Sequence, residues 1–171
     1  MNLLTLKFKA TECNGWPKLR VLFDLDIIET CEFTSDYAEI TLPVDLQDGE
    51  HSLIVELYGK NRSNTQVDSQ GAIVKDQRVE LIDMLVDGIK LPDYYKWRGI
   101  YRFDNQEHPQ SLLWGCNGEW QWDFNIPLLT WILDVKIEHT EKYNPPLISY
   151  ADRLIIEQDK IQQFEDQLSK L

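Results

Sequence analysis

Regular alternation of apolar and polar side chains limits how the first 125 residues can fold. In the stretch LTLKFKAT, Leu4, Leu6, Phe8 and Ala10 alternate with threonine and lysine. Successive side chains of a β-strand point to opposite faces, so this period of two places the four apolar groups on one face. The pattern predicts a strand with one face in a core and the other in solvent.

The same alternation continues in LRVLFDLDIIETCEF, residues 19–33. It predicts one long strand with Phe23 and Leu25 pointing inward. The carboxylates of Asp24 and Asp26 are then expected on the outer face.

Turn signals separate the strands. Asp87-Gly88 and Asn117-Gly118 favour tight type I′ hairpin turns, because both central residues of such a turn need a positive φ. Residues 69–71 indicate a small hairpin, and Pro43, which has no amide hydrogen, predicts that its strand lies at a sheet edge. Eight or more short strands at this spacing predict a mainly β fold, a jelly-roll-like β-sandwich over residues 1–125.

The pattern changes after residue 125. Residues 126–146 form a connecting segment that is predicted either as a helix opened by Pro127 or as a final strand. Residues 147–171 predict a C-terminal amphipathic α-helix with apolar residues at heptad spacing. The residues expected to contact a partner are Leu154, Ile161, Phe164 and Leu168. The partner is a second copy or another protein, and the alternative is a helix folded on its own sandwich.

Composition excludes several classes of partner. The net charge of −12 repels phosphate groups, so we expect no nucleic-acid partner. No run approaches the roughly 18 apolar residues of a membrane span, so we expect no membrane partner. The N-terminus alternates too early for a signal peptide, and the three cysteines form no C-x-x-C pair, which predicts reduced thiols and synthesis in a cytoplasm.

The residues associated with catalysis are sparse. His51, His108 and His139 are isolated and match no zinc-ligand spacing, and the chain has neither a glycine-rich phosphate loop nor a G-x-S-x-G elbow. We therefore predict that the protein is not an enzyme.

Two other groups of residues suit binding. Asp68 and Asp76 lie around a polar loop, where carboxylates either ligate calcium or stabilise turns. Trp97 and Tyr95 could stack their aromatic faces on sugar rings. From the residues alone we predict no cofactor, with calcium as the open alternative.

The segments GEHSLIV and DQRVELIDMLVDG, within residues 48–91, resemble xylan-binding, calcium-dependent carbohydrate-binding modules. The resemblance implies a β-sandwich fold. It also implies calcium ligation at Asp76, with Asp68 as a looser match, and a polysaccharide partner.

The same segment, together with KLPDYYKWRGIYRF and the late tryptophan-rich stretch, also resembles small virion-associated β-sandwich proteins of tailed phages. This resemblance implies a non-enzymatic structural component of the virion that assembles with other virion proteins and is made in the host cytoplasm. A module that binds cell-surface polysaccharide is the alternative function.

Overall fold

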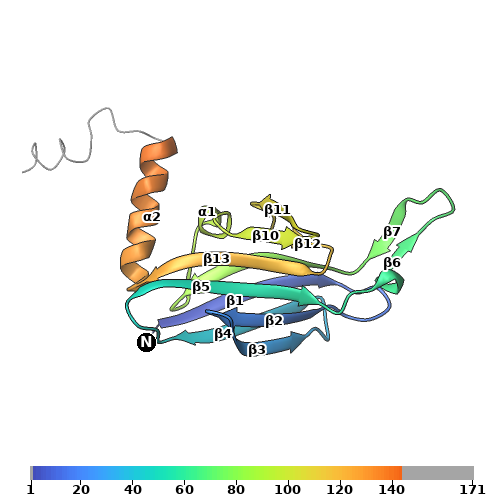
Figure 1. Ribbon diagram of the computed structural model, residues 1–171, viewed down its shortest axis with the longest axis horizontal. Helices are drawn as coiled ribbons and strands as arrows, with labels where there is room; N and C mark the ends of the chain where they lie inside the picture. Colours follow the sequence, from blue (N-terminus) through green and yellow to red (C-terminus); the bar gives the residue numbers. More distant parts are fainter. Residues whose placement is uncertain (1, 144–171) are drawn as a thin grey trace, which may run out of the picture. The chain divides into compact units, whose positions relative to one another are not determined.

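The computed structural model describes residues 2–143 (Figure 1). The chain divides into two compact units, residues 1–131 and 132–171. The predicted helix over residues 147–171 lies outside the described residues, and so do its expected contact residues Leu154, Ile161, Phe164 and Leu168.

The first unit contains two antiparallel sheets and a separate hairpin. The five-stranded sheet has the order β12 (Leu113–Trp114), β8 (Arg78–Val86), β1 (Asn2–Thr11) and β4 (Tyr37–Val44), with β9 (Ile89–Lys90) paired to β8. The six-stranded sheet has the order β11 (Gln106–Pro109), β10 (Ile100–Phe103), β13 (Gly118–Ile126), β5 (Gly49–Tyr58), β2 (Lys18–Phe23) and β3 (Asp26–Glu32). Strands β6 (Thr65–Val67) and β7 (Ile73–Asp76) pair only with each other.

Helical elements are few. The short elements η1 (Arg62–Asn64) and α1 (Asp93–Lys96) lie in connections, and α2 (Leu128–Tyr143) follows β13. Residues 128–143 of the connecting segment are therefore helical, which is the first of the two alternatives. Among residues 2–143, no helix is long and apolar enough to cross a membrane.

The alternation in the sequence places the core between the sheets. In β1 the inward residues Leu4, Leu6 and Phe8 are fully buried, as predicted, and so are Leu53 and Val55 of β5 in the six-stranded sheet. A mainly β sandwich followed by a helix is thus confirmed. Pro43 lies in β4, which pairs only with β1, so its strand is an edge strand as expected.

The predicted single strand over residues 19–33 is wrong. The chain reverses at Asp24 and Leu25, which have φ values of 48° and 78°, so β2 and β3 form a hairpin. Leu25 is 76% exposed in the turn instead of buried. Two consecutive positive φ values are those of a type I′ turn, and leucine gives no sequence signal for it.

The two Gly-containing turn predictions have different outcomes. Asp87 and Gly88 have φ values of 49° and 79° and join β8 to β9 by a two-residue turn, as predicted. Asn117-Gly118 forms no hairpin, because β12 pairs with β8 in one sheet and β13 pairs with β5 and β10 in the other. The segment is a crossover between the sheets.

Aromatic rings fill the core beside β13. Trp120, Trp122 and Phe124 alternate inward along β13 and are buried. Gly99 packs directly on this layer: a Cβ atom there would lie 2.2 Å from the indole of Trp120. Any side chain at position 99 must displace a fully buried ring.

We predict that Gly99→Ala lowers the free energy of unfolding by about 1–3 kcal/mol, because overpacking forces a rigid ring from its place. Chemical denaturation measures the change. Adding Trp120→Phe to the Gly99→Ala variant provides room for the methyl group, so Gly99→Ala should cost less in that background. An equal cost in both backgrounds would show that the indole is not the obstacle.

Candidate functional site

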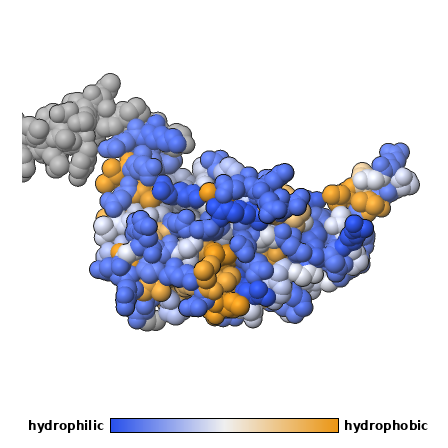
Figure 2. All heavy atoms as spheres, viewed as in Figure 1, coloured by the Kyte–Doolittle hydropathy of each residue, from blue (hydrophilic) through white to orange (hydrophobic). Residues whose placement is uncertain are grey.

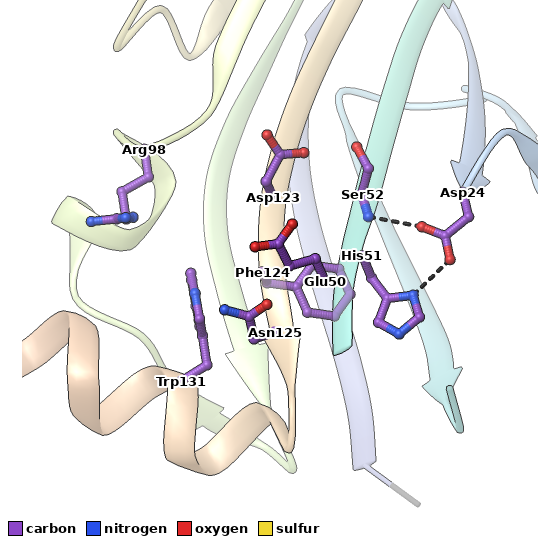
Figure 3. A pocket seen from close by; sticks show the side chains of 9 residues that line it. All are labelled: Asp24, Glu50, His51, Ser52, Arg98, Asp123, Phe124, Asn125 and Trp131. Atoms are coloured by element: carbon purple, nitrogen blue, oxygen red, sulfur yellow. Dashed lines mark hydrogen bonds and ion pairs between the residues drawn. The ribbon is translucent and has the colours of Figure 1, made fainter. Parts of the chain in front are cut away.

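A polar hollow of about 520 Å³ opens at one end of the six-stranded sheet. It lies where the β2–β3 turn, the start of β5, the end of β13 and the residue after the α1 segment come together (Figure 3). Its lining consists of Asp24, Glu50, His51, Ser52, Arg98, Asp123, Phe124, Asn125 and Trp131.

Strand pairing places the polar lining on one side of the sheet. Glu50 faces Asn125 and Ser52 faces Asp123 in the register of β5 and β13. Cross-strand partners point to the same face, and residues two apart along a strand do so as well. Two carboxylates, one amide and one hydroxyl are therefore grouped at the opening of the hollow (Figure 3).

Asp24 connects the β2–β3 turn to β5. Its Oδ1 accepts a hydrogen bond of 2.9 Å from the Ser52 amide, and its Oδ2 lies 2.6 Å from Nδ1 of His51. The Nε2 of His51 lies 2.7 Å from the carbonyl oxygen of Gln47. Both acceptors lack a hydrogen to donate, so both ring nitrogens can donate at once only when the ring is the protonated imidazolium.

The pKa values of this pair agree with the geometry. The hydrogen bond to Asp24, followed by the one to Gln47, raises the pKa of His51 above its ordinary value. The Ser52 amide and then the His51 ring lower the pKa of Asp24. Both ring nitrogens of His51 lie against acceptors of the chain, so the pair joins the β2–β3 turn to the start of β5.

We predict that His51 stabilises the fold mainly at lower pH. A raised folded-state pKa gives stability that is fully present below the unfolded value of about 6.5 and is lost as pH rises through the folded pKa. The difference in Tm between wild type and His51→Gln should therefore shrink from about pH 6 to about pH 9. The Asp24→Asn variant should likewise lose Tm relative to wild type mainly at lower pH. A Tm loss that is the same at all pH values in both variants would show that the Asp24–His51 pair is not the cause.

Trp131 forms the aromatic wall of the hollow. Its ring meets Trp122 edge-on, with centroids 5.0 Å apart and planes at 85°, and it also contacts Tyr95 at 5.9 Å and Phe124 at 6.5 Å. The ring is mostly buried, so it acts as a fixed wall and shows only an edge to a ligand.

The two aromatic residues predicted to contact a ligand take different places. Trp97, at the end of α1, is 48% exposed. Tyr95 is 1% exposed and stacks on Tyr94 at 4.5 Å, so it has a packing role and offers no face to a sugar. The same segment contributes Arg98 to the hollow, which the sequence did not indicate.

Asp76, the position predicted for calcium, already holds a cation of the chain. Its Oδ1 lies 2.6 Å from Lys60 Nζ and 2.5 Å from Thr65 Oγ1, and its Oδ2 lies 3.2 Å from Arg78 Nε. Burial raises the pKa of Asp76, but the hydrogen bonds from Lys60 and Thr65 outweigh it and hold the pKa below its ordinary value. Calcium ligation at Asp76 would require displacement of Lys60.

Asp68 lies apart from Asp76 and stabilises a turn. Its Oδ1 accepts hydrogen bonds of 2.8 Å from the Gln70 amide and 2.9 Å from the Ala72 amide, at the tip of the β6–β7 hairpin. Asp76 pairs with Thr65 at the base of the hairpin, roughly 10 Å of strand away from Asp68. The two carboxylates are therefore not placed to share one ion, and within residues 2–143 no three His, Cys, Asp or Glu side chains form a metal-binding group.

No protein-family model matches the sequence, and no curated protein matches it. The chain is similar to the carbohydrate-binding module vCBM60 solved in complex with galactobiose. The two are 15% identical over 70% of this chain and 96% of that one, with a TM-score of 0.46.

The selenomethionine form of vCBM60 is 16% identical over 71% of this chain and 90% of that one, again with a TM-score of 0.46. That structure is described as part of an evolutionary link, by circular permutation, between two families of calcium-dependent carbohydrate-binding modules. At this level of similarity, function has to be inferred from the residues of the chain itself.

Proposed function

We propose that this protein binds a polysaccharide at the hollow, without chemically changing it. The observation that carries the proposal is the grouping of Glu50, Asp123 and Asn125 on adjacent strands at an open, solvent-facing hollow. Carboxylates and amides of this kind accept and donate hydrogen bonds to sugar hydroxyls, and rigid strands hold them in fixed positions.

The hollow also has features that suit the binding of a short stretch of a long polysaccharide. It is open to solvent and mostly polar, whereas sites for drug-sized ligands enclose most of their ligand between apolar walls. Ser52 adds a buried hydroxyl that has no hydrogen-bond partner among the described residues. The edge of Trp131 supplies the apolar surface against which sugar C–H groups can pack.

Charge narrows the class of polysaccharide. Three carboxylates, Glu50, Asp123 and Asp24, line the hollow and outnumber its two basic side chains, Arg98 and His51, and the whole chain carries a net charge of −12. Polysaccharides rich in uronic acids or sulfate would meet this charge with repulsion. The favoured ligands are neutral polysaccharides or those that contain amino sugars.

We predict that native electrophoresis in gels containing neutral galactan, xylan or chitosan retards the protein in at least one of them, and that polygalacturonate does not. Glu50→Ala combined with Asp123→Ala should weaken the retarding interaction by at least about tenfold, since a hydrogen bond to a charged group contributes about 1.5–3 kcal/mol. No new reducing ends should appear during incubation.

Glu119→Ala is the matched control, because Glu119 is an exposed carboxylate on the same face of β13, roughly 13 Å from Asp123 and outside the hollow. Equal loss of binding in the control and in the double variant would contradict the placement of the site. Release of reducing ends by wild type would contradict binding without catalysis.

A second function, assembly with other virion proteins, has one observation in its favour. Val67, Ile73 and Val74 on the β6–β7 hairpin are more than half exposed, and Figure 2 shows apolar side chains on this hairpin. Grouped exposed apolar side chains favour contact with another protein. The virion setting and the assembly helix both remain predictions.

For the assembly role we expect the full chain to form a defined oligomer through the segment after residue 147. Replacing Ile161 and Phe164 with Asp should convert that oligomer to a monomer, because it places two charges on the predicted apolar stripe. Light scattering measures the solution mass, and an unchanged mass would reject the predicted contact.

A further inference from the structure

The ammonium group of Lys60 is held in a cage of oxygen atoms. Its Nζ lies 2.6 Å from Oδ1 of Asp76 and 2.9 Å from the carbonyl oxygen of Gln77, and it also donates to the carbonyl oxygen of Gly115. The side chains of Lys60 and Asp76 are each only 8% exposed. Three donors of one ammonium therefore meet three acceptors in a nearly buried position.

The cage joins three connections that are far apart in the sequence. Lys60 follows β5, Asp76 and Gln77 lie at the junction of β7 and β8, and Gly115 lies in the crossover from β12 to β13. The backbone of Lys60 is also fixed, because its amide donates to Asn117 Oδ1 at 2.9 Å and its carbonyl accepts from Asn117 Nδ2 at 2.8 Å. The lysine thus connects the end of one sheet to the end of the other.

A calcium ion does not fit this cage as the chain forms it. Calcium takes six to eight oxygen ligands, which include carboxylates, backbone carbonyls and waters. Here one carboxylate faces two cations of the chain, Lys60 and Arg78, so a divalent ion would enter a region that is already positively charged. The three oxygen acceptors form a site for a cation. The cation that fills it is the ammonium group of Lys60, which belongs to the chain itself.

We propose that the Lys60 ammonium supplies at this junction the positive charge that a bound metal ion would otherwise supply, so that the protein folds independently of calcium. This inference is separate from the proposed polysaccharide site, because the hollow lies at the start of β5 and Lys60 lies beyond its end. An ordinary ion pair would stabilise the fold as well, but its removal would leave no preference for an added cation.

The first test measures Tm of the full wild-type chain in millimolar calcium chloride and in chelator. We expect the same Tm in both. A site that binds calcium and is filled at about 100 times its Kd would raise Tm by several degrees. A rise of that size in wild type would overturn the proposal.

The second test uses Lys60→Ala, which removes the ammonium and opens space within the cage. We expect a lower Tm than wild type, and a Tm that is several degrees higher in calcium than in chelator. Lys60→Ala combined with Asp76→Asn should lose this response, because the only charged ligand is gone. Lys75→Ala is the matched control, since Lys75 forms an exposed ion pair with Glu12, and its Tm should change little and not respond to calcium.

Failure of the Lys60→Ala variant to fold would still decide the question. Refolding yield is then measured in calcium and in chelator, and folding only with calcium supports the proposal. No response to calcium, in Tm or in refolding yield, would show that Lys60 is an ordinary ion-pair partner and would overturn it.

Discussion

The inward rings of β13 are the packing element on which the rest of the first unit depends. Trp120, Trp122 and Phe124 fill the space beneath a central strand, and Trp131 and Trp114 close the layer around them. Stacked sheets lie about 10 Å apart, and large rings in rotamer-restricted positions fix that spacing. The outward residues of the same strand line the hollow, so the precision of the site comes from the core on the opposite face.

Strand β5 is held at both ends by charged side chains. At its start, Asp24 binds the Ser52 amide and the His51 ring, and just after its end, Lys60 binds three oxygens of other connections. In both places a charged group satisfies backbone groups that no sheet ladder reaches. These contacts hold the loops in place, and apolar burial supplies most of the driving force for folding.

Much of the sandwich could be predicted from local patterns, because side-chain alternation is set by strand geometry alone. Strand β1, the Asp87–Gly88 turn and the edge position of Pro43 are confirmed for that reason. The reversal at Leu25 could not be predicted, because leucine has no preference for positive φ and is placed there by the surrounding contacts. The crossover at residue 117 could not be predicted either, because it depends on which sheet each neighbouring strand joins.

The site was predicted less well, since its contacts join residues that are distant in the sequence. The pairs Asp24–Ser52 and Lys60–Gly115 leave no spacing pattern that a motif could record. Asp76 was predicted as a calcium ligand, and in the structure its carboxylate binds Lys60, Thr65 and Arg78. Its main partner is Lys60, and nothing in the sequence distinguishes this lysine from other charged loop residues.

The β6–β7 hairpin has a consequence for how such a protein can evolve. It makes no ladder with either sheet, and its contacts with the rest of the first unit are concentrated at its base, around Thr65 and Asp76 (Figure 1). Mutations toward its tip therefore leave the packing between the sheets unchanged. The tip is the part of the molecule where new sequences, lengths and recognition properties can accumulate at the lowest cost to folding.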